Sequence, residues 1–178
     1  MRKAAEHTPA RAILSTVGLA MGVLAGSVNA HLGIDMSLGP WLLGWLLVSI
    51  MVVVFLHEGL HAGVAGLLGH KASFGLRPPL VYVTFTGKLP RGHYMLVAIT
   101  PFVILNLLFG LLLAAGELNL FFNLSLIVNS IGSMGDIWAV LMLAGGPRGA
   151  MIQDTKSGFE VWVADEAINA GLGIPKEV

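Results

Sequence analysis

The segment His57-Glu58-Gly59-Leu60-His61 combines the residue types of a metal-dependent hydrolase at a spacing that suits one metal ion. Residues four apart share one face of a helix, so His57 and His61 can direct their imidazoles at the same ion. In HExxH helices this ion is zinc, and the Glu takes a proton from the water on the metal. We therefore predict that His57 and His61 bind zinc and that Glu58 is the catalytic acid and base.

A catalytic zinc usually has a third protein ligand, and depth in the membrane favours Asp136 for this position. Between position 58 and Glu117 the chain has no acidic residue, so the candidates are Glu117, Asp136 and the acids of the tail, such as Asp154. His57 lies 16 residues into its apolar segment and Asp136 lies 18 residues into its own. At 1.5 Å per residue these depths differ by only about 3 Å, whereas Glu117 is roughly 25 Å away.

Polar residues near Asp136 suggest contacts with a substrate. Asn129, Ser133 and Asp136 fall at positions i, i+4 and i+7, which is one helical face. Asn129 is a candidate donor to a substrate carbonyl or oxyanion, and it is equally suited to link two helices. Asn106 and His93, from the preceding apolar region, are weaker candidates for lining the site.

The elements that must hold these residues are membrane-spanning helices, because the chain is short and strongly apolar. It has 178 residues, a hydrophobic fraction of 56% and a mean hydropathy of +0.82. Charged residues make up 11%, against about 25% in soluble domains. We predict an all-α polytopic membrane protein, with residues 1–178 in a single domain. Its four transmembrane helices cover about 12–32, 41–68, 94–115 and 118–144, and a cytoplasmic tail covers 145–178.

The distribution of basic residues orients these helices. All ten Lys and Arg residues lie before the first segment, between the second and third, or after the fourth. The positive-inside rule then places both termini and the middle loop in the cytoplasm. Residues 1–30 also fit a signal peptide with a cleavage site at Val28-Asn29-Ala30, and this alternative stays open.

The overall charge and the absence of cysteine limit the partners and the ligands. The net charge is zero, so the sequence indicates no nucleic-acid partner. The chain has no cysteine, which excludes disulfides and thiolate ligands and leaves His, Asp and Glu to hold a metal.

The middle loop predicts a short β strand or hairpin between the second and third helices. Residues 80–86 are rich in β-branched and aromatic types, Pro78-Pro79 marks a turn before them, and Gly87 ends the run. An exposed strand edge can hold an extended peptide through main-chain hydrogen bonds. A purely structural loop fits the sequence equally well.

Together, the HEGLH segment, the strand-like loop and the segment from Asn129 to Asp136 resemble the zincin membrane peptidases. These are small prokaryotic proteins related to the site-2 (M50-type) proteases, and the resemblance covers roughly residues 50–155. It implies that His57, His61 and Asp136 hold Zn2+ and that Glu58 is the catalytic residue. It also implies location in a prokaryotic plasma membrane.

These observations favour a zinc-dependent intramembrane metalloprotease. Its expected partners are the lipid bilayer and a membrane protein or peptide substrate, which it would cut near the cytoplasmic side. The alternatives are a membrane metal transporter and a non-catalytic adaptor with a structural zinc. A transporter needs a second set of ligands along a path, and a structural zinc site usually closes with four ligands.

Overall fold

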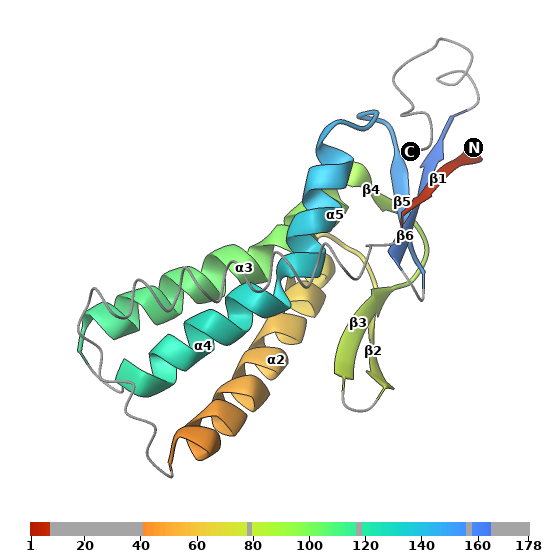
Figure 1. The fold of residues 1–178 in the computed structure, drawn as a ribbon. Helices are drawn as coiled ribbons and strands as arrows, with labels where there is room; N and C mark the ends of the chain where they lie inside the picture. Colours follow the sequence, from red (N-terminus) through yellow and green to blue (C-terminus); the bar gives the residue numbers. More distant parts are fainter. Residues whose placement is uncertain (8–40, 78–79, 117–118, 156–157, 165–178) are drawn as a thin grey trace.

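The computed structural model describes residues 1–7, 41–77, 80–116, 119–155 and 158–164. Within these residues a bundle of helices lies beside a group of short strands (Figure 1). The first predicted span, at 12–32, and the signal peptide proposed as its alternative lie almost entirely outside the described residues.

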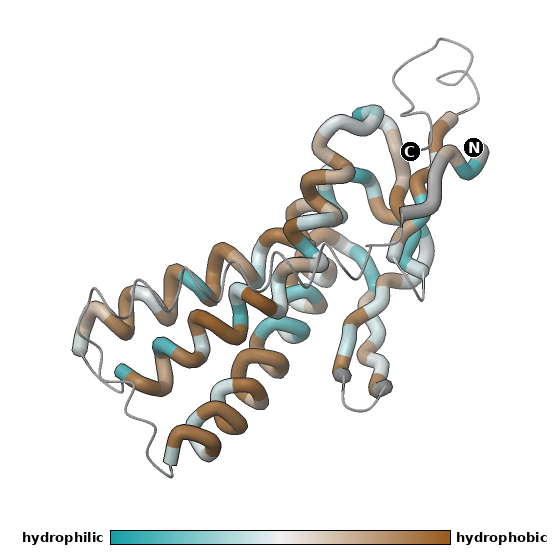
Figure 2. Tube along the Cα trace, viewed as in Figure 1, coloured by the Kyte–Doolittle hydropathy of each residue, from teal (hydrophilic) through white to brown (hydrophobic). Residues whose placement is uncertain are grey.

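Two long apolar helices match the second and third predicted spans. Helix α2 covers Leu42–Leu67 and helix α3 covers Arg91–Ala114. At 1.5 Å per residue they are about 39 and 36 Å long, which exceeds the roughly 30 Å of a bilayer core. Figure 2 shows hydrophobic residues along most of both helices.

The fourth predicted span is a broken helix, which corrects the expectation of one continuous element. Helices α4 (Asn119–Gly132) and α5 (Met134–Ala144) meet at Ser133 with a bend of 43°. The Ser133 hydroxyl donates to the Asn129 carbonyl at 2.8 Å, and Gly132 and Gly135 flank the break. Serine bonding to the backbone and nearby glycines are known causes of kinks.

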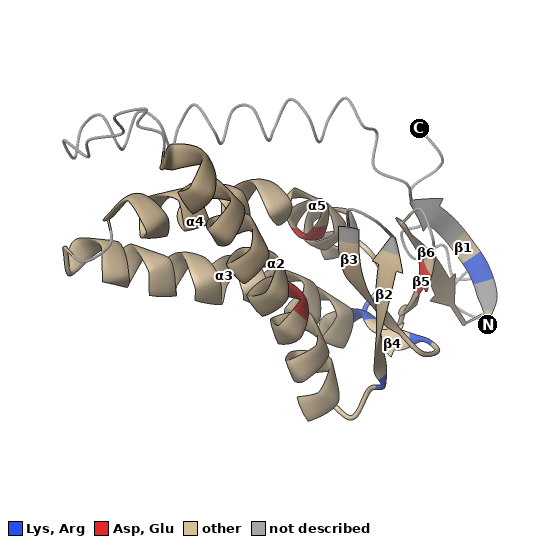
Figure 3. Ribbon diagram, turned by 90° about the horizontal axis from the view of Figure 1, so that it is seen from below, with Lys and Arg blue, Asp and Glu red and all other residues tan. Residues whose placement is uncertain are grey.

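The described residues therefore contain two helices long and apolar enough to cross a membrane, and a third if the bent pair forms one span. Charged residues are sparse along the helices and are found mainly around the strands (Figure 3). Leu105 and Phe109 of α3 pack with Val53 of α2 in one apolar core, against which residues of α4 also lie.

The middle loop forms the predicted hairpin. Strand β2 (Ala72–Arg77) pairs antiparallel with β3 (Leu80–Phe85), and Gly75 lies opposite Tyr82. A Cβ on Gly75 would come within 2.3 Å of the Tyr82 ring, so the ring occupies the space that a side chain there would need.

A second, four-stranded sheet was not expected from the sequence, so the all-α prediction was incomplete. The sheet has the antiparallel order β1-β6-β5-β4, which brings both ends of the described chain together. Its strands are β1 (Arg2–His7), β4 (Leu89–Pro90), β5 (Met151–Thr155) and β6 (Gly158–Val163). The predicted tail thus includes strands β5 and β6.

This sheet packs against the helices through its own apolar core. Phe159, Val161 and Val163 of β6 are buried, and they alternate with less buried residues, as expected for a strand with one covered face. They cluster with Ile152 of β5 and with Ala139 and Leu143 of α5. The sheet therefore fixes the position of α5, and with it the position of Asp136.

Candidate metal centre

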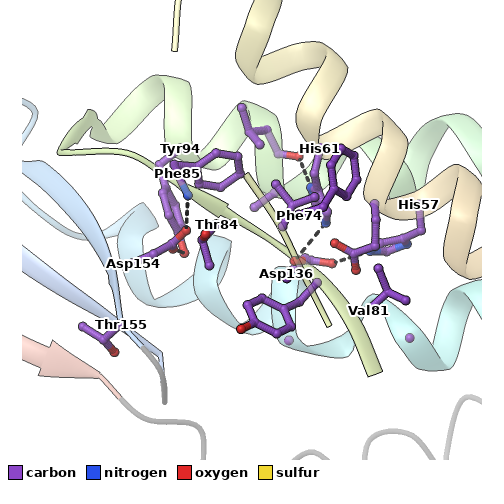
Figure 4. A pocket seen from close by; sticks show the side chains of 18 of the residues that line it. His57, His61, Phe74, Val81, Thr84, Phe85, Tyr94, Asp136, Asp154 and Thr155 are labelled. Atoms are coloured by element: carbon purple, nitrogen blue, oxygen red, sulfur yellow. Dashed lines mark hydrogen bonds and ion pairs between the residues drawn. The ribbon is translucent and has the colours of Figure 1, made fainter. Parts of the chain in front are cut away.

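Two helices that are distant in sequence bring His57, His61 and Asp136 together. Both histidines are buried on α2, and Asp136 lies in the first turn of α5, just after the bend. Nε2 of His57 is 3.1 Å from Oδ2 of Asp136, and Nε2 of His61 is 3.6 Å from Oδ1 (Figure 4). One potential ligand atom from each residue lies within 4.8 Å of the others.

The hydrogen bonds behind the two rings determine which nitrogens carry protons. Nδ1 of His61 lies 2.9 Å from the carbonyl oxygen of Val97, which can only accept, so this nitrogen donates. The amide nitrogen of Asn129 faces the carbonyl of Pro101 at 3.3 Å, which turns its Oδ1 toward Nδ1 of His57 at 3.1 Å. His57 therefore also donates from Nδ1.

In their neutral forms, both histidines then present an unprotonated Nε2 to the Asp136 carboxylate. With neither Nε2 protonated, acceptor atoms of all three residues converge with no donor among them, an arrangement that a bound cation would satisfy. Ligand atoms about 2.05 Å from a tetrahedral zinc are about 3.3 Å apart. The two rings lie 3.1 and 3.6 Å from different oxygens of Asp136, and one ligand atom from each of the three residues lies within 4.8 Å of the others. Histidine zinc ligands typically donate a hydrogen bond from their other ring N–H to an oxygen atom, as these two do. The residues present fit a zinc ion.

A cleft of about 1140 Å³ lies in front of this cluster. His57, Glu58, His61 and Asp136 form part of its wall, and the hairpin and the end of β5 form another part. Glu58 accepts a hydrogen bond from the backbone of Val83 on β3. The acid next to the histidines is thus held beside a strand.

One edge of β3 faces this cleft. The amide of Thr86 donates to the Lys71 carbonyl at 2.9 Å, so hydrogen-bonded pairs with β2 alternate from there. Val81, Val83 and Phe85 then direct their backbone groups away from β2. In agreement, Val83 meets Glu58, and the Phe85 amide donates to Asp154 at 3.3 Å.

Asn129, Asn106 and His93 are not among the residues that line the cleft. Asn129 lies behind His57, and its amide nitrogen also donates to Oδ1 of Asn106 at 3.2 Å. His93 forms a hydrogen bond with His70 at 2.9 Å. Glu117, one of the considered third ligands, lies outside the described residues.

Asp154 is the cleft residue whose place the sequence did not indicate. It was among the acids considered as a third ligand, but its partners are Tyr94 and Phe85, and it lies outside the metal cluster. Tyr94 donates its hydroxyl to Oδ1 at 2.8 Å. Burial raises the pKa of the Asp154 carboxyl, while the two hydrogen bonds partly oppose this shift. The sequence of the short strand β5 has no pattern that predicts Asp154 at the cleft.

Comparison with known proteins shows that the chain is similar to a known protein family. Residues 50–151 match the family described as "Putative zincin peptidase". A protein of Pyrococcus woesei, named as an uncharacterized 24.7 kDa protein in the gap 5′ region, is 31% identical over 143 residues. The match covers 76% of this chain and 64% of that relative, so the chain spans less than two thirds of the relative's length. No solved structure matches the chain.

Proposed function

Because the chain belongs to the zincin peptidase family, we propose that it is an intramembrane zinc metallopeptidase that cuts membrane proteins or peptides near the cytoplasmic side. The family itself indicates a metallopeptidase and implies zinc. The observation that carries the proposal is the convergence of His57, His61 and Asp136 beside Glu58, inside a cleft between apolar helices and a strand edge.

In this proposal, His57, His61 and Asp136 hold the ion and Glu58 moves the proton. Zinc, when bound, supplies Lewis acidity, which polarises a carbonyl and lowers the pKa of water to about 7. Glu58 takes the proton of the attacking water and delivers it to the leaving amine. The Val83 hydrogen bond keeps its carboxylate at the cleft. Asn129 keeps the His57 ring in place from behind, which replaces the substrate contact suggested by the sequence.

The edge of β3 is the proposed binding surface for the substrate. An extended peptide can add to it as a further strand, with hydrogen bonds to the Val81 amide and to the carbonyls of Val81 and Val83, since the Val83 amide is taken by Glu58. A peptide in this position runs past Glu58 and the metal ligands, since these line the same cleft. A helical substrate must unwind before it can bind in this way.

The first experiment measures bound metal in detergent-purified protein by mass spectrometry. We expect about one zinc per chain in the wild type and in Glu58→Gln, and loss of zinc in Asp136→Ala. A wild type without zinc under retaining conditions, or full binding by Asp136→Ala, would contradict the site.

The second experiment tests hydrolysis. The wild type and Glu58→Gln are incubated with a solubilised membrane-protein fraction and with a library of peptides, and new termini are mapped by mass spectrometry. Cleavages made by the wild type and absent with Glu58→Gln support the peptidase. If a zinc-loaded wild type produces no such termini, the peptidase proposal fails, and the metal site must serve transport or structure.

A further inference from the structure

The hairpin that carries the proposed binding edge depends on anchors outside itself. A two-stranded hairpin is marginally stable on its own, and within the described residues β2 and β3 pair only with each other. Phe74 and Leu76 of β2 are 64% and 72% exposed, so this strand gains little from packing. The position of β3 at the cleft must therefore come from contacts along its other edge.

Asp154 supplies such a contact at the end of β3. One carboxylate oxygen accepts the Phe85 amide at 3.3 Å, and the other accepts the Tyr94 hydroxyl at 2.8 Å. The carboxylate thus ties together three elements: the hairpin, helix α3 and strand β5. Figure 4 shows Asp154, Tyr94 and Phe85 grouped on one side of the pocket, apart from the metal ligands.

The frame that holds Asp154 is firmly packed. Its neighbour Ile152 is fully buried and pairs with Leu89 and Val161 on the two adjacent strands. The ring of Tyr94 packs edge-on against Phe85, with centroids 6.3 Å apart, and against Phe159 at 5.8 Å. Asp154 therefore connects the hairpin, whose strand β2 is largely exposed, to a buried and well-packed core.

The anchored residue is close to the catalytic machinery along the strand. Phe85 and Val83 are two residues apart, which is about 7 Å in a strand. Both direct their amides to the same edge, one to Asp154 and the other to Glu58. A shift of β3 at Phe85 therefore moves the backbone beside Glu58 by a similar amount.

We propose that Asp154 is a positioning residue, which holds the substrate-binding edge of β3 in line with Glu58 by accepting hydrogen bonds from Phe85 and Tyr94. This proposal rests on the proposed function. The Phe85 amide is taken by Asp154 and the Val83 amide by Glu58, so the groups of this edge left to a peptide are the Val81 amide and the carbonyls of Val81 and Val83.

The test compares Asp154→Ala with Asp154→Asn, in the full chain in detergent. Asparagine can restore both contacts, since its carbonyl accepts from Phe85 and its amide nitrogen donates to the Tyr94 oxygen. Gln153→Ala is the matched control, because its side chain points to the opposite face of β5. Tyr94→Phe removes one of the two hydrogen bonds and keeps the ring.

The first measurement is backbone hydrogen exchange, which needs no substrate. We expect Asp154→Ala to accelerate exchange in residues 80–86 and to leave both α2 and the zinc content unchanged. Asp154→Asn should exchange no faster than the wild type, Gln153→Ala should match it, and Tyr94→Phe should lie between the wild type and Asp154→Ala.

The second measurement is kinetic and uses a peptide found to be cleaved in the library. Asp154→Ala should raise KM by roughly tenfold and change kcat by less than about threefold, since misplacement by about 1 Å can cost up to 100-fold. Asp154→Asn should restore KM.

Wild-type exchange and KM in Asp154→Ala would overturn the proposal, as would an Asp154→Asn protein that behaves like the alanine variant. If Asp154→Ala does not fold, Tyr94→Phe decides, and wild-type behaviour of that variant overturns it. Should the wild type cleave nothing, the proposed function fails on that result, and hydrogen exchange still decides the role of Asp154.

Discussion

At the scale of single residues, the metal centre depends on the groups behind the histidines as much as on the ligands. The Val97 carbonyl and Oδ1 of Asn129 each accept a hydrogen bond from a ring N–H, so that both Nε2 atoms can face the Asp136 carboxylate. The amide of Asn129 is oriented in turn by Pro101 and Asn106. The geometry is therefore set by a chain of hydrogen bonds that crosses three helices.

Replacing Asn129 should weaken metal binding. In Asn129→Leu the His57 N–H loses its buried acceptor, and the ring loses its fixed orientation. We expect zinc affinity to fall by about 10- to 100-fold, as for other residues that hold metal ligands. Competition with a chelator measures this, and Ser130→Ala, which removes a neighbouring hydroxyl, should bind like the wild type. Equal affinities for Asn129→Leu and the wild type would contradict the role.

Replacing Glu58 should separate metal binding from chemistry. Glu58→Gln keeps the size of the side chain but cannot take a proton. The turnover rate should fall by about 10²- to 10⁴-fold, with zinc content unchanged. Single-turnover cleavage of a library-derived peptide measures the rate, and a loss smaller than tenfold would exclude Glu58 as the acid and base.

The acid Asp154 should make stability depend on pH. Burial raises its folded-state pKa above the unfolded value of about 3.9, so its contribution is fully present below that value and is lost as pH rises through the folded pKa. Asn cannot ionise, so Asp154→Asn does not lose this stability as pH rises. We therefore expect equal Tm values near pH 3.5 and a higher Tm for Asp154→Asn at neutral pH. A difference that does not grow with pH would contradict the shift.

At the scale of elements, the broken helix sets the direction of Asp136. The bend at Ser133 turns α5 away from α4, and Asp136 follows in the first turn of the new helix. The far end of α5 is held by Arg91 at the start of α3. Its guanidinium donates to the carbonyls of Leu143 and Ala144, both at 2.6 Å. These two carbonyls belong to the last turn, where helical partners are missing.

Removing Arg91 should loosen α5. In Arg91→Ala two terminal carbonyls lose a charged donor, and we expect a loss of about 1–2 kcal/mol in the free energy of unfolding. Thermal unfolding in detergent measures the change. Arg148→Ala removes an exposed arginine of the following loop and should stay within about 0.5 kcal/mol of the wild type. Equal effects of the two substitutions would argue against the cap.

At the scale of the whole molecule, the two ends of the described chain close a sheet that supports the cleft. Strands β1 and β6 pair, and the core beneath them joins β5 and β6 to α5 and to Tyr94 of α3. The cleft therefore has one wall from the apolar helices and another that depends on the small sheet and the hairpin. Disturbance of the sheet should reach the metal centre through α5.

Phe159 provides the test of this coupling. It is 1% exposed and packs against the rings of Tyr94 and Trp138. Phe159→Ala should reduce the free energy of unfolding by roughly 3–5 kcal/mol and lower zinc retention. Lys3→Ala, which removes the exposed ion pair with Glu160, should cost less than about 1 kcal/mol. Full zinc retention in a destabilised Phe159→Ala would show that the sheet and the metal centre are independent.

The features that depend on local pattern could be predicted from the sequence. Helix spacing placed His57, Glu58 and His61 together, apolar length located α2 and α3, and β-branched residues after Pro78-Pro79 indicated the hairpin. Depth along the helices was enough to select Asp136 among the acids. The single domain, the topology and the cytoplasmic termini remain predictions from that reading.

The bend at Ser133, the second sheet, and the places of Asn129 and Asp154 could not be predicted from local pattern, because they depend on tertiary contacts. The sheet was missed although Phe159, Val161 and Val163 alternate, because strands this short are stable only when paired with segments distant in the chain. Asn129 and Asp154 act through partners 72 and 60 to 69 residues away. The spacing of residues in the sequence predicts contacts between residues that are close along the chain. The direction of a side chain also depends on the residues from distant segments that pack around it.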